Sequence, residues 1–195
     1  MNPTILFDVG GVLADLGSPT AAMNLPYSDE HFWQAWLASP NVRAYETGRM
    51  PGHQALPAIS RDLDVSDRGD FEQIFRQWHL RLFPGVERLI ANLPDDIELL
   101  LLSNINPIHW QQLSGSTQIF DRFTHLFLSY ELGIYKPEAA AFDYVIDMLD
   151  RDPADILFVD DTEANVVAAR RHGIDAHQVN DFETLEYRLQ YRQAS

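Results

Sequence analysis

Residues 4–13 read Thr-Ile-Leu-Phe-Asp-Val-Gly-Gly-Val-Leu, an apolar run that ends in an acidic residue and a glycine pair. A short apolar run bounded by turn residues is typical of a buried strand. Asp8 then stands at the tip of that strand, and Gly10 and Gly11 follow it in a turn where the backbone can approach a ligand closely. The stretch therefore predicts either a functional carboxylate at a strand tip or a carboxylate that only caps the turn.

Four more apolar runs follow along the chain, at residues 98–103, 126–129, 156–160 and 175–179. Stretches with helical periodicity separate them, at residues 85–93, 107–113, 138–149 and 163–172. This alternation of strands and helices predicts an α/β fold, a three-layer arrangement with a parallel sheet between helices. In such sheets ligands bind beyond the carboxyl ends of the strands.

Residues 16–82 interrupt this alternation with helical patterns around 29–37, 52–63 and 67–80 and with no convincing strand. They are expected to form an inserted α-helical cap domain, and residues 1–15 and 83–195 are expected to form the core domain. Turn residues at both edges of the insert suit two hinges. Its aromatic residues fall at helical spacings and are expected mainly to pack inside the insert: Trp33, Trp36, Phe71, Phe75 and Trp78.

Composition excludes several classes of protein. With 195 residues the chain has room for one principal domain and a small accessory module. It has no cysteine, which excludes disulfide scaffolds, thiolate metal sites and cysteine nucleophiles. The net charge of -15 argues against a nucleic-acid partner, and no apolar run is long enough for a membrane span. We expect a cytoplasmic protein without a membrane partner; its oligomeric state cannot be read from the sequence.

Polar residues recur where the predicted strands end. Ser103 and Asn104 end the second run, where a hydroxyl and backbone N–H groups suit a phosphate oxygen, although this pair is also common in ordinary turns. Asp160 and Asp161 end the fourth run, and adjacent carboxylates there favour a bound magnesium ion or an acidic cap for the next helix. Lys136, after the third run, is the only lysine beside thirteen arginines, which favours a required ammonium over a chance surface cation.

In order and spacing, four segments resemble the motifs of haloacid dehalogenase-type hydrolases: residues 7–13, 102–104, 133–138 and 158–161 with Asn165. The resemblance spans nearly the whole chain. It is greatest to the branch with a small helical cap after the first motif, which includes the alpha-D-glucose-1-phosphate phosphatases and the phosphatase domain of soluble epoxide hydrolases. It implies a Rossmann-like core, magnesium as cofactor and an aspartyl-phosphate intermediate.

The resemblance also assigns roles to individual residues. Asp8 would attack phosphorus, and Ser103 and Lys136 would complete the catalytic set. Phosphate would be held by Gly10, Gly11, Ser103, Asn104 and Lys136. Arg49, with Arg43 near it in the sequence, would contact the far end of the bound substrate. Magnesium would be bound by Asp8, the backbone carbonyl of Gly10, Asp161 and, directly or through water, Asp160. The seven histidines show no paired metal-ligand spacing and are expected to be structural or exposed.

The sequence departs from this pattern at Gly10, where most phosphatases of the superfamily carry a second aspartate as general acid and base. Its loss removes a contribution of about 10²- to 10⁴-fold unless another group, such as a cap residue, replaces it. The expected function is a magnesium-dependent phosphatase of a small phosphorylated metabolite, with a sugar phosphate as the expected class. A 2-haloacid dehalogenase and a catalytically degenerate protein that binds a phospholigand or a protein partner are the alternatives.

Overall fold

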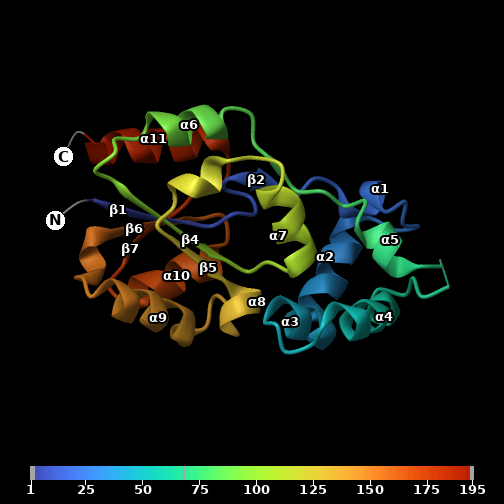
Figure 1. The fold of residues 1–195 in the computed structure, drawn as a ribbon. Coiled ribbons are helices and arrows are strands. Elements are labelled where there is room, and N and C mark those ends of the chain that lie inside the picture. Colours follow the sequence, from blue (N-terminus) through green and yellow to red (C-terminus); the bar gives the residue numbers. More distant parts are fainter. Residues whose placement is uncertain (1–2, 68, 194–195) are drawn as a thin grey trace.

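The centre of the molecule is a five-stranded parallel sheet (Figure 1). The computed structural model describes residues 3–67 and 69–193. The strands are β1 (Thr4–Phe7), β4 (Glu98–Ser103), β5 (His125–Leu128), β6 (Ile156–Asp160) and β7 (Asp175–Gln178), in the order β5-β4-β1-β6-β7. Thr4 pairs with Glu98 on one side and with Ile156 on the other, so β1 lies between β4 and β6. All five strands predicted from apolar runs are confirmed to within one residue at each end.

Helices cover both faces of the sheet, which confirms the predicted three layers. Figure 1 shows α6 (Val86–Asn92) and α11 (Phe182–Gln193) above the sheet and α9 (Ala139–Leu149) and α10 (Glu163–Arg171) below it. Because successive strand residues point to opposite faces, Leu6 packs in the core between the sheet and helices α9 and α10, while Ile5 and Phe7 pack in the core on the other face. The remaining core elements are α7 (Pro107–Ser114), α8 (Ser129–Leu132) and two 3₁₀ turns, Ile119–Arg122 and Pro153–Asp155.

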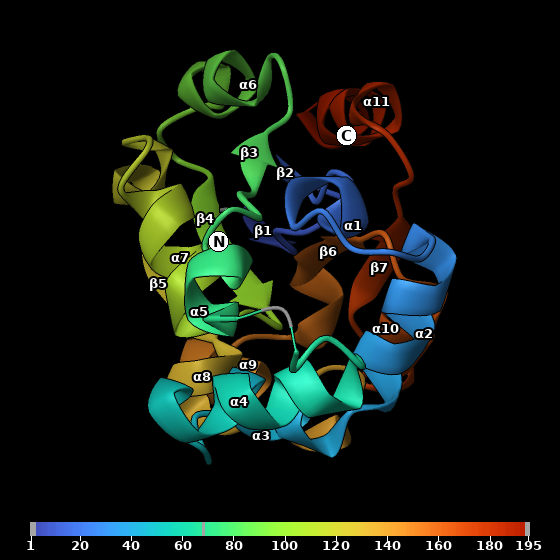
Figure 2. The same cartoon turned by 90° about the vertical axis from the view of Figure 1, so that its right-hand side faces the viewer.

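Five helices form the insert between β2 (Ala14–Asp15) and β3 (Arg81–Leu82). They are α1 (Pro19–Ala22), α2 (Asp29–Ala38), α3 (Pro40–Glu46), α4 (Gly52–Asp62) and α5 (Phe71–Phe75). In Figure 1 the helices α2 to α5 gather beyond the end of the sheet toward which β1 runs. Figure 1 and Figure 2 both show α3 next to α8 of the core. The insert therefore faces the carboxyl ends of the strands.

Three details of the insert differ from the sequence expectation. The helix expected over residues 67–80 is confined to α5. Asp70 caps its N-terminus by accepting hydrogen bonds from the N–H groups of Glu72 and Gln73, so the helix begins at Phe71. Arg68, within the expected range, lies outside the described residues. Helix α3 was not predicted, although Ser39 caps it and Pro40 opens it. The short strand β3 was also missed, because a ladder of two residue pairs with β2 has no periodicity to detect.

The aromatic residues of the insert pack together, as predicted. Trp36 stacks on Phe32 with ring centroids 5.5 Å apart and on Phe75 at 5.8 Å, and Trp78 meets Trp36 edge-on at 5.4 Å. The Trp78 indole N–H also donates to the carbonyl of Leu16 at 2.7 Å, which ties the exit of the insert to its entrance. None of the helices in the described part of the chain has the length and apolar character needed to cross a membrane.

Candidate active site

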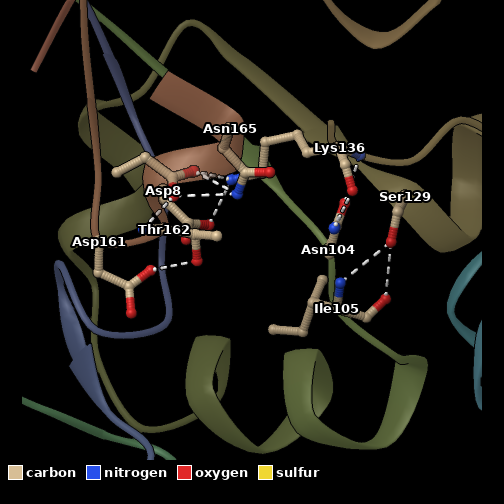
Figure 3. A network of polar contacts seen from close by, with 9 residues as sticks. Asp8, Asn104, Ile105, Ser129, Lys136, Asp161, Thr162 and Asn165 are labelled. Carbon is tan, nitrogen blue, oxygen red and sulfur yellow. Dashed lines mark hydrogen bonds and ion pairs between the residues drawn. The ribbon is translucent and has the colours of Figure 1, made fainter. Parts of the chain in front are cut away.

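Three carboxylates lie together at the tips of β1 and β6, and a buried lysine pairs with two of them. Lys136 Nζ lies 2.9 Å from Asp8 Oδ1 and 2.5 Å from Asp160 Oδ2, and its side chain is 1% exposed. Oxygens of Asp8, Asp160 and Asp161 lie within 4.8 Å of one another. We call Asp8, Lys136, Asp160 and Asp161 the strand-tip cluster. It brings together residues from three of the four motif segments (Figure 3).

Asp160 is fully buried and surrounded by donors. Asn165 Nδ2 donates to both of its carboxylate oxygens at 3.0 Å, and the backbone N–H of Thr162 donates to Oδ1 at 2.8 Å. Together with Lys136, these contacts occupy both oxygens of Asp160 with protein groups. Asp160 is therefore placed to fix the position of the Lys136 ammonium, and its predicted place as a metal ligand stays a prediction.

Asp161 and Asp8 keep more of their oxygen lone pairs available. The hydroxyl of Thr162 donates to Asp161 Oδ1 at 3.1 Å. Gly11 has φ +73° and would place an added Cβ only 2.3 Å from Asp161 Oδ2. Only glycine allows this approach, both because of the backbone conformation and because of the space. The structure thus sets Gly11, predicted to hold phosphate, directly against the Asp161 carboxylate.

The charge of the strand-tip cluster suits a bound divalent cation. Burial, opposed by Lys136 and reinforced by Asp160 and Asp161, raises the pKa of Asp8. Burial and the neighbouring Asp160 also raise the pKa of Asp161. Burial lowers the pKa of Lys136, but Asp160 and Asp8 raise it further, so that the ammonium form is retained. One ammonium beside three carboxylates leaves an excess of negative charge. A hard divalent cation, which prefers oxygen ligands, would balance it.

Ser103 and Asn104 hold different positions beside this cluster. Asn104 exchanges two hydrogen bonds with the backbone of Lys136: Nδ2 donates to the Lys136 carbonyl and Oδ1 accepts from its N–H, both at 2.9 Å (Figure 3). The amide of Asn104 therefore positions the lysine. Ser103 is 2% exposed, and its hydroxyl has no hydrogen-bond partner among the described residues. It remains available to a ligand.

The cluster opens into a cavity of about 550 Å³ between the core and the insert. Asp8, Gly10, Ser103, Lys136 and Asp161 line its core side. The apolar residues that also line the cavity, which we call the apolar wall, are Leu16, Trp33, Trp36, Leu37, Trp78, Leu80 and Phe83. Three tryptophans expected mainly to pack inside the insert thus also face this cavity. A larger hollow of about 830 Å³ near Arg81, Arg88 and Thr117 includes none of the strand-tip cluster.

The two arginines predicted at the far end of the substrate make contacts between the insert and the core. Arg43 forms an ion pair with Glu138 and lies 4.4 Å from the ring centroid of Tyr135. Arg49 Nη2 donates to the carbonyl of Gly133 at 3.3 Å. Neither arginine is among the residues that line the cavity. Their contact with a substrate stays a prediction, and the structure brings neither to the strand-tip cluster.

Three further residues line the cavity, and only His109 had a role predicted from the sequence. Glu46 is a buried carboxyl from the end of α3, and Tyr135 donates its hydroxyl proton to it at 3.0 Å. His109 stacks on Phe75 at 4.7 Å and is 4% exposed, as the structural role expected for histidines predicts. Tyr135 lies in the motif segment 133–138, but nothing in the sequence shows that α3 brings Glu46 into contact with it.

Known proteins with similar sequences include two phosphatases. A relative from Bacteroides thetaiotaomicron, D-ribitol-5-phosphate phosphatase, is 28% identical over 91% of this chain and 92% of its own length. The sesquiterpene phosphatase astK of Aspergillus oryzae is 28% identical over 90% of this chain and 89% of its own. Drimenol cyclase drtB of Aspergillus calidoustus is 26% identical over 89% of this chain, which spans only 33% of that enzyme.

Solved structures share the fold. A HAD family enzyme of Bacteroides thetaiotaomicron, in complex with magnesium and inorganic phosphate, superposes with a TM-score of 0.74 at 24% identity over 91% of this chain and 94% of that one. A dehalogenase with an intermediate complex superposes with a TM-score of 0.67 at 18% identity over 92% and 85%. The family model for haloacid dehalogenase-like hydrolases matches residues 3–173, so the chain belongs to the haloacid dehalogenase-like hydrolase family.

Proposed function

We propose that this hydrolase is a magnesium-dependent phosphatase that cleaves a small phosphorylated metabolite through an aspartyl-phosphate intermediate on Asp8. The observation that carries the proposal is the strand-tip cluster, in which oxygens of three carboxylates lie within 4.8 Å of one another beside a cavity, and two of these carboxylates pair with one buried ammonium. An anionic substrate would be repelled from three carboxylates unless a cation is bound among them. A phosphatase supplies a reason for both the carboxylates and the lysine.

The residues divide the work of phosphoryl transfer. A carboxylate oxygen of Asp8 attacks phosphorus, and the leaving oxygen departs on the opposite side, toward the insert. The free hydroxyl of Ser103 donates to a phosphoryl oxygen. The Lys136 ammonium, paired with Asp160 and carried on a backbone that Asn104 holds, balances the negative charge. In the second step water attacks phosphorus and frees Asp8.

Magnesium would be held by Asp8, Asp161 and the carbonyl of Gly10, with Asp160 behind them. When bound, it neutralises charge on the transferring phosphoryl group. Asp8 has a pKa raised by burial, so a nearby cation also favours the ionised carboxylate that the attack requires. The magnesium present in the related Bacteroides structure supports this choice of metal.

The apolar wall faces the leaving group and would hold the organic part of the substrate. A sugar phosphate, through its C–H faces, and a terpenyl phosphate can both pack against Trp33, Trp36 and Phe83. The names of the two phosphatase relatives cover both of these classes. A terpenyl phosphate is therefore a second candidate substrate beside the expected sugar phosphate, and the apolar wall favours it.

Phosphate release from a panel of sugar, terpenyl and acyl phosphates and nucleotides, with and without magnesium, tests the function. We expect release that requires magnesium and is lost in Asp8→Asn, and the panel ranks the substrate classes. Absence of release from every member would favour the binding-protein alternative, whereas halide release from 2-haloacids without a metal would favour a dehalogenase.

A further inference from the structure

The strand-tip cluster contains no group suited to protonate the leaving oxygen. Asp8 is the proposed nucleophile, Lys136 is held by two carboxylates, and both oxygens of Asp160 are occupied by protein donors. Asp161 is a proposed ligand of magnesium, and Gly10, beside the cluster, has no side chain. In an in-line displacement the leaving oxygen lies opposite Asp8 and faces the insert. A proton donor must therefore come from the insert side of the cavity.

Glu46 lies on that side. It is the last residue of α3, it is 6% exposed, and it lines the same cavity as Asp8 and Ser103. Among the described residues its carboxyl accepts one hydrogen bond, from the Tyr135 hydroxyl to Oε2. Buried carboxyls are costly and are normally paired with a cation or several donors, so this single bond is unusual for a structural glutamate.

Three contacts fix the end of α3 against the segment that carries Lys136. Gly48, with φ +66°, approaches α8 so closely that an added Cβ would lie 2.1 Å from the carbonyl oxygen of Tyr130. Arg43 pairs with Glu138 and covers the ring of Tyr135. Glu46 itself is bound to Tyr135, the residue before Lys136. The carboxyl of Glu46 is thus held in a set position relative to the strand-tip cluster.

The protonation state of Glu46 suits an acid that also acts as a base. Burial raises its pKa to about 7, while the hydrogen bond from Tyr135 and the charge of Arg43 lower it. These two residues are the titratable and charged groups that act on its carboxyl from the core segment and from α3 itself. Near neutral pH both the acid and the carboxylate are populated, as general acid–base catalysis requires.

We propose that Glu46 is the general acid and base of the reaction, in place of the aspartate that Gly10 does not provide. This rests on the proposed phosphatase function. In the first step the bond between Asp8 and phosphorus forms, the bond to the leaving oxygen breaks, and that oxygen takes the proton of Glu46. In the second step the Glu46 carboxylate takes a proton from water, whose oxygen binds phosphorus while the bond to Asp8 breaks. Glu46 ends protonated, as it began.

The dependence on the leaving group tests this role. An alkyl phosphate needs a proton on its leaving oxygen, whereas a nitrophenyl phosphate does not. In Glu46→Gln, kcat/KM should therefore fall about 10²-fold or more for an alkyl phosphate and change less than about threefold for the nitrophenyl ester. Because the second step still lacks its base, nitrophenol should appear in a burst followed by slow turnover. The matched control Glu30→Gln, at an exposed glutamate of α2, should behave as wild type.

Equal loss of kcat/KM for both substrates would show that Glu46 only shapes the site, and no loss for either would show that it is dispensable; both results overturn the proposal. These outcomes are distinct from failure of the proposed function, in which wild type itself releases no phosphate or Asp8→Asn remains active.

A second variant keeps the proposal testable if Glu46→Gln does not fold. Tyr135→Phe removes the hydrogen bond that lowers the pKa of Glu46. The alkaline limb of kcat/KM for the alkyl phosphate, where Glu46 loses its proton, should then move to higher pH. A limb that stays in place in Tyr135→Phe would refute the assignment.

Discussion

Lys136→Met tests whether the strand-tip cluster is held together by its one cation. In the folded protein the ammonium is 1% exposed and contacts Asp8 at 2.9 Å and Asp160 at 2.5 Å. The substitution does not remove the same share of partners from the two carboxylates, because Asp160 keeps the hydrogen bonds donated by Asn165 and Thr162. Asp8 alone is left as a buried carboxylate with neither a cation nor a hydrogen-bond donor among the described residues.

The expected magnitude follows from that single unpaired carboxylate. Removing one partner of a buried ion pair costs about 3–5 kcal/mol, whereas an exposed pair on a helix contributes less than about 1 kcal/mol. Arg76→Met is the matched control, since Arg76 pairs with Glu72 at 2.6 Å on an exposed helical turn and also loses one positive charge.

Urea unfolding without magnesium, followed by circular dichroism, measures both variants. We expect Lys136→Met to lose about 3–5 kcal/mol of the free energy of unfolding and Arg76→Met to lose less than about 1 kcal/mol. Addition of magnesium should narrow the difference, because a second cation can neutralise Asp8. Equal losses in the two variants would refute the view that Lys136 balances a buried charge.

Two further predictions concern Gly11 and His109. Gly11→Ala should weaken magnesium binding at least tenfold by calorimetry, because its Cβ would lie 2.3 Å from Asp161 Oδ2; Gly17→Ala, with a similar φ of +59° but nothing within 4 Å, should bind magnesium as wild type does. Burial lowers the pKa of His109 to about 3. Below pH 6.5 the unfolded chain therefore binds a proton that the folded chain does not. The free energy of unfolding should decrease as the pH is lowered through this window, by about 2 kcal/mol at pH 5. His109→Phe should remove this part of the slope in thermal unfolding measured from pH 7 to 5; an unchanged slope would contradict it.

Periodicity and strand-tip chemistry predicted most of the core. The apolar run before Asp8 and the four later runs are long enough to define strands, and a parallel sheet then brings Asp8, Ser103 and Asp160 to one edge. Lys136 was singled out by its rarity and by its place after the third apolar run, and the structure places its ammonium between Asp8 and Asp160. These features depend on local sequence and on one topological rule, which is why they could be predicted.

The contacts between insert and core could not be predicted in the same way. Glu46 and Tyr135 are 89 positions apart, and their hydrogen bond depends on how α3 meets α8. That approach is allowed by Gly48, whose requirement for glycine appears only when Tyr130 is in place. The side-chain amide of Asn104, predicted to hold phosphate, turns to the backbone of Lys136 for a similar reason, since no local pattern indicates a partner 32 positions away.

The central claim is that Asp8 attacks phosphorus, and one isotope experiment tests it directly. A single turnover of the best phosphorylated substrate is run in water enriched in ¹⁸O with enzyme in excess, and the released phosphate and the peptide containing Asp8 are then weighed by mass spectrometry. Because water attacks phosphorus in the second step, the account predicts one ¹⁸O atom in the phosphate and none in Asp8. Label in the Asp8 carboxylate, the result of water attacking its carbonyl carbon as in a dehalogenase, would contradict it.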